Sequence, residues 1–284
     1  MPIKLIAMDL DGTLLNSDSK VPEENARALA EAAARGIEIV VVTGRRYHSA
    51  RLIVEALPCE LDLIVNNGAL IKSKEGETRQ RLLLPAETAR RVLEATAEFR
   101  DFASVVFDRP RENQVILQTV DWDDPFRGGY FRRSREFIAQ VSPLTDCLRG
   151  SNGAPAEDPI QVMFVGLCAT VRDALTKLQA LPFADEYTLA FTEYLTRDIS
   201  VLDVLRHGVT KGFALAEWAR RLGIRREEVM AIGDNWNDRE MLEYAGLPVV
   251  MGNSVEGLKS KGWTVTLSND ENGLAAAIRR YALD

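Results

Sequence analysis

The chain has 284 residues, of which 46% are hydrophobic and 27% charged, and its formal net charge at pH 7 is -7. This length allows two domains with separate hydrophobic cores, while the acidic balance argues against a nucleic-acid partner, which needs a basic surface. No apolar stretch approaches the ~20 residues of a transmembrane helix, and the first residues lack the apolar length and cleavage pattern of a signal peptide. We therefore expect a cytoplasmic protein that binds neither nucleic acid nor membranes.

The few cysteines and histidines argue against several kinds of site. Three cysteines at wide and irregular spacing, Cys59, Cys147 and Cys168, predict neither a disulfide framework nor a zinc knuckle. His48 and His207 have no partner histidine at helical or hairpin spacing. The sequence therefore argues against zinc catalysis and against a histidine-based catalytic triad.

An apolar run at residues 3–8 ends abruptly in two carboxylates, Asp9 and Asp11. A short apolar run bounded by turn residues predicts a buried parallel strand, and in open α/β sheets ligands bind at the carboxyl ends of such strands. A helix is expected over residues 22–34, because Pro22 and two acidic residues mark its first turn. The next apolar run, residues 37–42, then completes a β-α-β unit.

The next two strand ends are also polar. The strand at residues 37–42 is followed by Thr43, Gly44, Arg45 and Arg46, and a helix is predicted over residues 47–57. A third strand, residues 61–65, is followed by Asn66, Asn67 and Gly68. These polar residues are therefore expected at the same edge of the sheet as Asp9 and Asp11.

From about residue 84 the pattern changes to short elements typical of an α+β domain with antiparallel strand pairs. The predicted helices are residues 86–99, 130–140 and 171–180, and the predicted strands are residues 103–107, 114–119 and 161–165. The interval between Thr43 and Lys211 is much longer than one crossover connection needs. We therefore predict an inserted α+β domain at residues 85–194 and a discontinuous core formed by residues 1–84 and 195–284.

The core pattern resumes after the insertion. The predicted elements are a strand at 198–204, a helix at 211–222, a strand at 229–232, a helix at 236–244, a strand at 247–250, a short helix at 255–259, a strand at 263–266 and a helix at 273–281. The strand at 229–232 ends in Gly233 and Asp234, with Asn237 and Asp238 shortly after. Two strand ends thus present carboxylates, and adjacent parallel strands would bring them within reach of one ion.

These residue types fit phosphoryl transfer assisted by a hard cation. Mg²⁺ takes oxygen ligands, which Asp9, Asp234 and Asp11, the last either by its carboxylate or by its backbone carbonyl, can supply. A carboxylate on a rigid strand end can attack phosphorus, so we predict Asp9 as the nucleophile. Asp11 is predicted to protonate the leaving oxygen and then to deprotonate water.

The remaining candidate residues have supporting roles. We predict that the phosphoryl oxygens, over which transition-state charge is spread, are bound by Leu10, Thr43, Gly44, Lys211 and Asn237. Asp238 is predicted to orient Lys211 or the water around the metal. The predicted substrate contacts are Arg45, Arg46 and Asn67.

Each motif alone also has an ordinary structural explanation. Asp9 and Asp11 can cap a turn, Asp234 can belong to a common Gly-Asp-Asn turn, and Lys211 can be an exposed helix lysine. The joint presence of four chemically compatible elements at strand ends of one α/β sheet favours a functional site over these alternatives.

The sequence resembles the haloacid dehalogenase-like (HAD) superfamily and, within it, the Cof-type sugar phosphatase family. The matching motifs are Asp9 to Leu15, Thr43 to Arg45, Lys211 with Gly212, and Gly233 to Asp238, together with Asn67 to Ala69 and Asn272 to Ala275. The resemblance implies a Rossmann-like parallel-sheet core, Mg²⁺, an aspartyl-phosphate intermediate and an inserted α+β cap of type C2. Bulky Trp236 and the charged residues shortly before Lys211 depart mildly from the family pattern.

These observations favour a Mg²⁺-dependent phosphatase that acts on a small-molecule phosphomonoester. The substrates that we expect are sugar phosphates, or cofactor phosphates such as flavin mononucleotide and pyridoxal phosphate. A phosphomutase or other phosphotransferase acting on sugar phosphates is the first alternative, and a non-catalytic ligand-sensing protein is the second. We expect a monomer or a homodimer.

Overall fold

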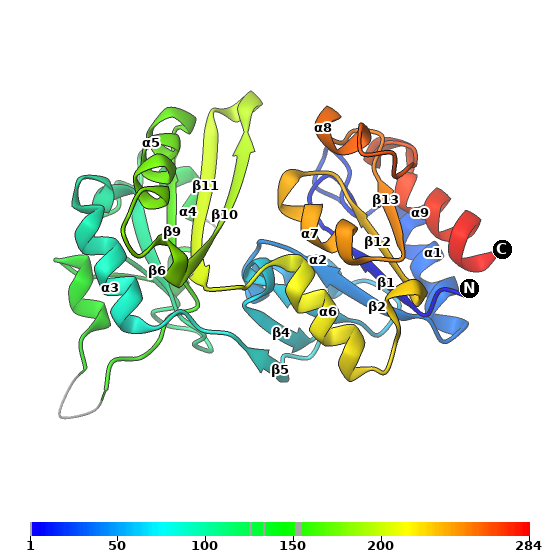
Figure 1. Ribbon diagram of the computed structural model, residues 1–284, viewed down its shortest axis with the longest axis horizontal. Helices are drawn as coiled ribbons and strands as arrows, with labels where there is room; N and C mark the ends of the chain where they lie inside the picture. The colour runs from blue at the N-terminus through cyan, green and yellow to red at the C-terminus, as the bar shows by residue number, and fades with distance from the viewer. Residues whose placement is uncertain (1, 125–126, 133, 151–154) are drawn as a thin grey trace. The chain divides into compact units, whose positions relative to one another are not determined.

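The computed structural model describes residues 2–124, 127–132, 134–150 and 155–284 (Figure 1). The chain divides into two compact units, one formed by Met1–Arg81 with Val209–Asp284 and the other by Leu82–Gly208. A β-sheet lies in each unit. None of the helices in the described ranges has the length and apolar character needed to cross a membrane.

The sheet of the first unit has eight strands. In sheet order they are β14 (Thr264–Val265), β13 (Leu247–Val250), β12 (Val229–Gly233), β1 (Leu5–Met8), β2 (Glu38–Val42), β3 (Asp62–Val65), β4 (Leu70–Ser73) and β5 (Thr78–Arg81). The strands from β14 to β3 are parallel, and β4 and β5 add an antiparallel edge. Because β1 lies between β12 and β2, the residues that follow these three strands emerge at one edge of the sheet. The predicted α/β fold with a parallel-sheet core is confirmed.

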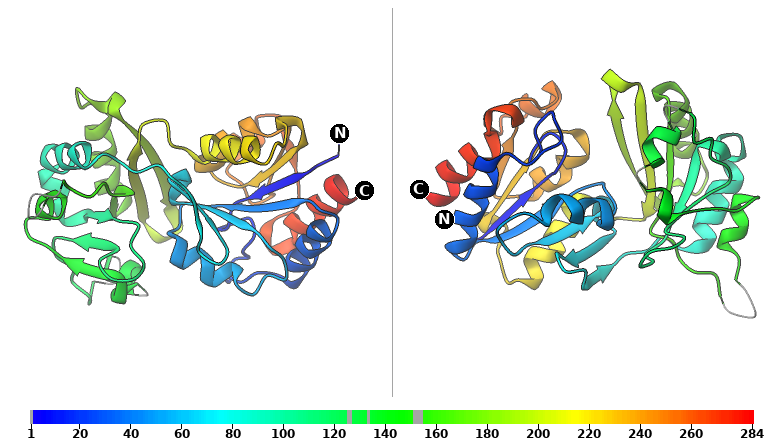
Figure 2. Two further views of the ribbon diagram at one scale, coloured as in Figure 1. Left: turned by 90° about the horizontal axis from the view of Figure 1, so that it is seen from below. Right: turned by 180° about the vertical axis from the view of Figure 1, so that it is seen from behind.

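Helices cover both faces of this sheet. They are α1 (Glu23–Ala34), α2 (Tyr47–Val54), α6 (Lys211–Arg221), α7 (Arg239–Tyr244), α8 (Glu256–Lys259) and α9 (Gly273–Ile278). Helix α6 lies on one face, and α1 and α9 lie together on the opposite face (Figure 2). Alternate residues of β1 serve the two faces: Leu5 and Ala7 pack with Leu215 of α6. This burial on both sides explains why β1 is continuously apolar.

The second unit is an α+β structure. Its sheet contains, in order, β10 (Tyr187–Tyr194), β11 (Ile199–Arg206), β9 (Gln161–Gly166), β6 (Ala103–Val106), β7 (Val115–Leu117) and β8 (Ile138–Gln140). Its helices are α3 (Ala86–Ala95), α4 (Arg127–Arg132) and α5 (Cys168–Gln179). Helices α3 and α5 pack on one face of this sheet around buried residues such as Val92, Val171 and Phe164.

The boundaries of the second unit differ from the predicted insertion at residues 85–194. The strand predicted at residues 198–204 corresponds to β11, which pairs along its length with β10 and also with β9. Residues 195–208 therefore belong to the second unit, although the sequence analysis placed them in the core. The strand β10 was not predicted, although Tyr187, Leu189 and Phe191 at alternate positions are the pattern of a half-buried strand.

Two other parts of the structure also differ from the sequence analysis. The helix predicted over residues 130–140 is wrong, because helix α4 ends at Arg132 and residues 138–140 form strand β8, which pairs in parallel with β7. Strands β4 and β5 were not predicted. In the first case, pairing with a strand about 23 residues away overrides the local sequence signal. Strands β4 and β5, by contrast, pair locally with β3 and with each other.

Glu228 immediately precedes β12, and its contacts make a contribution to folding stability that can be measured. Its carboxylate accepts hydrogen bonds from Arg225 and lies 2.9 Å from Lys4 Nζ. Hydrogen bonds from Arg225 and then Lys4 lower the pKa of Glu228 from 4.5 to about 2. Because this pKa is lower in the folded protein than in the unfolded chain, the ionised carboxylate stabilises the fold at pH values above 4.5. This stabilisation is lost as the pH falls through about 2.

We therefore expect Glu228→Gln to lower the Tm at pH 7, and its difference from the wild type to shrink as the pH falls below about 4.5. Thermal unfolding of both proteins, followed by circular dichroism across this pH range, measures the effect. A Tm difference that does not change with pH would contradict this account.

Candidate active site

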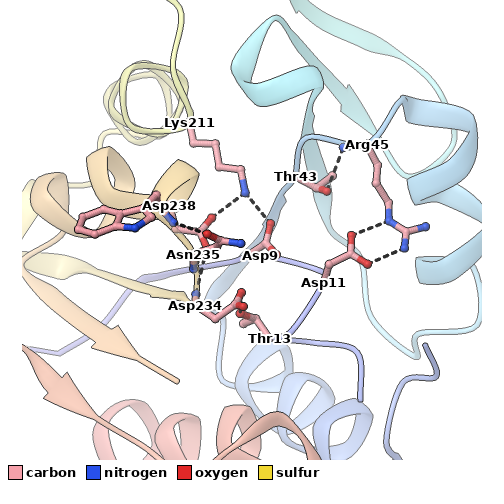
Figure 3. Close-up of polar contacts among 10 residues, drawn as sticks. Asp9, Asp11, Thr13, Thr43, Arg45, Lys211, Asp234, Asn235 and Asp238 are labelled. Atoms are coloured by element: carbon pink, nitrogen blue, oxygen red, sulfur yellow. Dashed lines mark hydrogen bonds and ion pairs between the residues drawn. The ribbon is translucent and has the colours of Figure 1, made fainter. Parts of the chain in front are cut away.

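The loops after β1 and β12 meet at the carboxyl edge of the sheet (Figure 3). The Asp9 N–H donates to the carbonyl of Ile232 at 3.0 Å, and the Thr13 hydroxyl donates to Asp234 Oδ1 at 3.2 Å. Gly12 has a φ of +80°, and a Cβ at this position would lie 2.4 Å from Asp234 Oδ2. A glycine is thus required for the two acidic loops to approach this closely.

Lys211 places a buried cation between two carboxylates. The Thr210 hydroxyl accepts from the Phe213 N–H and caps α6, so Lys211 is the first residue of that helix. Its Nζ donates to Asp9 Oδ1 at 2.5 Å and to Asp238 Oδ1 at 2.6 Å. Only 1% of the Lys211 side chain is exposed, so water screens these ion pairs little.

Asp238 organises the loop after β12 as well as Lys211. Its Oδ2 accepts from the N–H groups of Asp234 and Asn235 at 3.0 and 3.1 Å, while Oδ1 accepts from Lys211. Both carboxylate oxygens are therefore engaged, and the side chain is fully buried. Gly233 is packed against it, because a Cβ there would lie 2.7 Å from Asp238 Cβ.

The site carries more negative than positive charge. Burial, with the nearby charges of Asp238 and Asp11, raises the pKa of Asp9 to about 7 despite Lys211. Burial, with the charges of Asp238 and Asp9, also raises the pKa of Asp234 well above its ordinary value. Burial alone would lower the pKa of Lys211, but Asp238 and Asp9 raise it, so the lysine is cationic at neutral pH.

This charge imbalance fits a divalent cation. Among the described residues, Asp9, Asp234 and Asp238 each offer a carboxylate oxygen, and these atoms lie within 4.8 Å of one another. A hard cation would counter both the burial and the mutual repulsion that raise these two pKa values. Because both oxygens of Asp238 already accept hydrogen bonds, Asp9 and Asp234 are the carboxylates best placed to hold the metal.

The Asp11 side chain is turned away from this cluster. Its carboxylate accepts two hydrogen bonds from the Arg45 guanidinium, from Nε at 2.7 Å and from Nη2 at 2.6 Å (Figure 3). Arg45 Nη1 also donates to Ser49 Oγ at 3.4 Å. This arrangement directs the Asp11 carboxylate away from the Asp9, Asp234 and Asp238 cluster, and it pairs Arg45, predicted as a substrate contact, with the predicted acid–base residue.

The predicted residues after β2 and β3 lie beside one another. Thr43 Oγ1 accepts from the Arg45 N–H at 3.1 Å, and the carbonyl of Thr43 accepts from the Asn67 N–H at 3.1 Å. Gly44 lies against the amide group of Asn67, which a Cβ on the glycine would approach to 3.1 Å. Arg46 directly precedes α2.

Two predicted phosphate-binding residues lie within the loops that carry the acids. Asn237 is half-buried in the 3-10 turn Trp236–Asp238. Leu10 is buried, and its carbonyl accepts from the N–H groups of Thr13 and Leu15. The Leu10 carbonyl thus anchors the loop, and because the side chain is buried, the backbone N–H is the part of Leu10 that can serve a ligand.

Some residues that shape the site were not predicted. Thr13 contacts Asp234, and it belonged to the first motif without being given a role. Ser254 Oγ donates to the backbone carbonyl of Asp234 at 2.6 Å. No motif or periodicity in the sequence distinguishes Ser254, because its contact depends on how two separate loops fold.

Comparisons with known proteins show which family the chain belongs to. The sequence model of the haloacid dehalogenase-like hydrolase family matches residues 6–278. The chain is 32% identical over 286 residues to phosphatase YwpJ of Bacillus subtilis, covering 96% of this chain and 98% of the relative. It is 28% identical over 291 residues to pyridoxal phosphate phosphatase YbhA of Escherichia coli, covering 100% of both. A solved haloacid dehalogenase-like hydrolase from B. subtilis has a TM-score of 0.80 and 27% identity, covering 98% of this chain and 99% of that one.

The chain therefore belongs to the haloacid dehalogenase-like hydrolase family. Relatives such as YwpJ and YbhA are Cof-type phosphatases, and the protein is an enzyme of the phosphatase class. Members of this class generally use a divalent metal, and the carboxylate cluster is suited to hold one.

Proposed function

We propose that the protein hydrolyses phosphomonoesters of small metabolites through a phosphorylated Asp9, with Mg²⁺ as the metal. The observation that carries this proposal is the buried Lys211 ammonium, which lies 2.5 Å from Asp9 and 2.6 Å from Asp238. One edge of the sheet thus brings together the proposed nucleophile Asp9, the buried cation of Lys211 and Asp234, the second acid that we propose binds the metal.

In the first half-reaction, an Asp9 carboxylate oxygen attacks the substrate phosphorus and the bond from phosphorus to the leaving oxygen breaks. Asp11, once it has left Arg45 and taken up a proton from solvent, gives that proton to the leaving oxygen, so an alcohol leaves and an aspartyl phosphate remains. The Asp11 carboxylate has to turn from Arg45 toward the leaving oxygen to do this. Arg45 therefore fixes the resting position of the acid.

In the second half-reaction, water attacks the same phosphorus and passes a proton to Asp11. The bond from phosphorus to Asp9 breaks, which restores the carboxylate and releases inorganic phosphate. Lys211, Asn237, the Thr43 hydroxyl and the backbone N–H groups near Leu10 and Gly44 bind the phosphoryl oxygens, where negative charge is spread in each transition state. Asp238 keeps Lys211 aimed at Asp9.

Mg²⁺ held by Asp9, Asp234 and the backbone of Asp11 would supply positive charge to the phosphoryl oxygens and reduce the repulsion between the acids and the substrate. Without it, the buried carboxylates repel both one another and an incoming dianion.

The substrate classes that we propose are sugar phosphates and cofactor phosphates such as flavin mononucleotide and pyridoxal phosphate. The name of the relative YbhA supports including pyridoxal phosphate. Arg46 and Asn67 are proposed as contacts to the substrate, and the second unit, Leu82–Gly208, as the cap domain that sets specificity.

A phosphate-release screen over these metabolites tests the proposal. We expect release from at least one sugar or cofactor phosphate in Mg²⁺, loss of release in EDTA, and recovery when Mg²⁺ is restored. Asp234→Asn should require a higher Mg²⁺ concentration and turn over more slowly, because it removes one charged ligand, while the exposed Asp101→Asn serves as the matched control. Transfer of phosphate to a second sugar without net release would indicate a mutase, and binding without either reaction would indicate a sensor.

A further inference from the structure

The loop that follows Asp11 is held by three asparagine side chains. Asn253 Nδ2 donates to the carbonyl of Gly12 at 2.9 Å, and Asn269 Nδ2 donates to that of Leu15 at 2.9 Å. Asn25 Nδ2 donates to the carbonyl of Leu14 at 3.1 Å. Three of the four carbonyls between residues 12 and 15 thus accept a hydrogen bond from an asparagine.

The same asparagines connect this loop to a distant part of the chain. Asn253 Oδ1 accepts from the Asn269 N–H at 2.8 Å, and Asn25 Oδ1 accepts from the Ala275 N–H at 3.1 Å. The side-chain amides of Asn253 and Asn25 therefore each link two backbone segments: Nδ2 donates to one segment and Oδ1 accepts from the other. Together Asn25, Asn253 and Asn269 link the loop to residues 269–275, and we call them the asparagine frame.

The position of this loop matters for the acidic cluster. Gly12 is in contact with the Asp234 carboxylate, and Thr13 donates a hydrogen bond to it. The segment that carries Asn253 also holds Asp234 itself, since Ser254 Oγ and the Val255 N–H both donate to its carbonyl, at 2.6 and 3.1 Å. A shift of the loop would therefore change the distance between the two acidic loops.

Amide side chains are well suited to this role. Asn25 is fully buried and Asn269 is 6% exposed, so the carbonyls that they serve cannot be satisfied by water instead. An aspartate of the same shape would keep the acceptor but lose the donor, and would place a carboxylate oxygen against a carbonyl oxygen. Asn253 is exposed, so its replacement leaves the core undisturbed.

We propose that the asparagine frame is a set of positioning residues that fixes the loop after Asp11 relative to Asp234, and so sets metal affinity and turnover. This inference rests on the proposed function for its effect on turnover, while its effect on metal binding is independent of the substrate. The frame touches neither the phosphate-binding candidate Thr43 nor Lys211, so it acts on kcat more than on KM.

The test uses the full-length variants Asn269→Asp and Asn253→Ala. We expect the Kd for Mg²⁺ alone, measured by titration calorimetry, to rise at least about fivefold, and kcat to fall about 10- to 100-fold, since small displacements of catalytic groups have effects of this size. KM should change less than about threefold, because the phosphate-binding candidates outside the loop are untouched. Asn253→Ala decides the question if Asn269→Asp does not fold.

Thr96→Val is the matched control. The Thr96 hydroxyl is buried and donates to the carbonyl of Val92 at 2.7 Å in the second unit, so the variant also loses one side-chain hydrogen bond to the backbone. We expect it to lower the Tm without changing kcat or the Kd for Mg²⁺. If the frame variants lower only the Tm, and leave both kcat and the Kd within twofold of the wild type, the proposal is overturned. A wild type that binds Mg²⁺ but releases no phosphate would refute the proposed function, while the Kd values would still decide on the frame.

Discussion

We expect Asp9→Asn to lose phosphate release almost completely, with kcat lower by roughly 10⁴-fold or more, as is typical when a covalent nucleophile is removed. An amide has no charge to attack phosphorus, and it is also a poorer ligand for a hard cation. The Lys211 ammonium remains, but it would then donate to a neutral oxygen instead of a carboxylate.

The same substitution should not damage the fold. Burial raises the pKa of Asp9 to about 7, so in metal-free protein above that pH the ionised carboxylate lowers the stability of the folded state relative to the unfolded chain. Asparagine removes this penalty while keeping the shape of the side chain. We therefore expect the metal-free Tm of Asp9→Asn to equal or exceed that of the wild type at pH 8, and Mg²⁺ to raise it less.

Phosphate release, metal-free Tm and acid-quenched mass spectrometry together check this prediction. The wild type should gain the mass of one phosphoryl group during turnover, and Asp9→Asn should not. The exposed Asp101→Asn should behave as the wild type in all three measurements. Turnover by Asp9→Asn close to the wild-type rate would reject Asp9 as the nucleophile.

The sequence was most informative where local patterns and sheet topology coincide. The strands β1, β2 and β12 are short apolar runs that end in turn residues, so their positions could be predicted from the chain alone. The proximity of Asp9 to Asp234 then followed from the general arrangement of parallel strands, whose carboxyl ends share one edge. Lys211 was included on the basis of its motif, and the structure places its ammonium between Asp9 and Asp238.

Contacts between distant side chains could not be predicted in this way. The orientation of Asp11 depends on a guanidinium 34 residues away, and Asn253 and Asn269 contact the loop across 241 and 254 residues. Such hydrogen bonds leave no periodic signal. The second unit was also harder to delimit, because β10 and β11 are defined by their pairing with each other and with β9.

The largest combined effect on stability and activity is expected for Lys211→Met. Lys211 is the cation that contacts both Asp9 and Asp238, and methionine fills a similar volume without charge or donors. Removing one partner of a buried ion pair leaves uncompensated carboxylates and destabilises the fold by about 3–5 kcal/mol. Loss of a donor aimed at developing phosphoryl charge should also lower kcat by about 10²- to 10³-fold.

A second substitution separates these two effects. In the double variant Lys211→Met with Asp238→Asn, one positive and one negative charge are removed together, and the side-chain carbonyl of the new amide can still accept from the N–H groups of Asp234 and Asn235 that Asp238 serves in the wild type. The double variant should therefore recover part of the lost stability, measured by urea unfolding, because fewer unpaired charges remain buried. Its kcat should stay low, because the cation needed near Asp9 is still missing. If the double variant is no more stable than Lys211→Met, the charge balance of the cluster does not account for the role of the lysine in the fold.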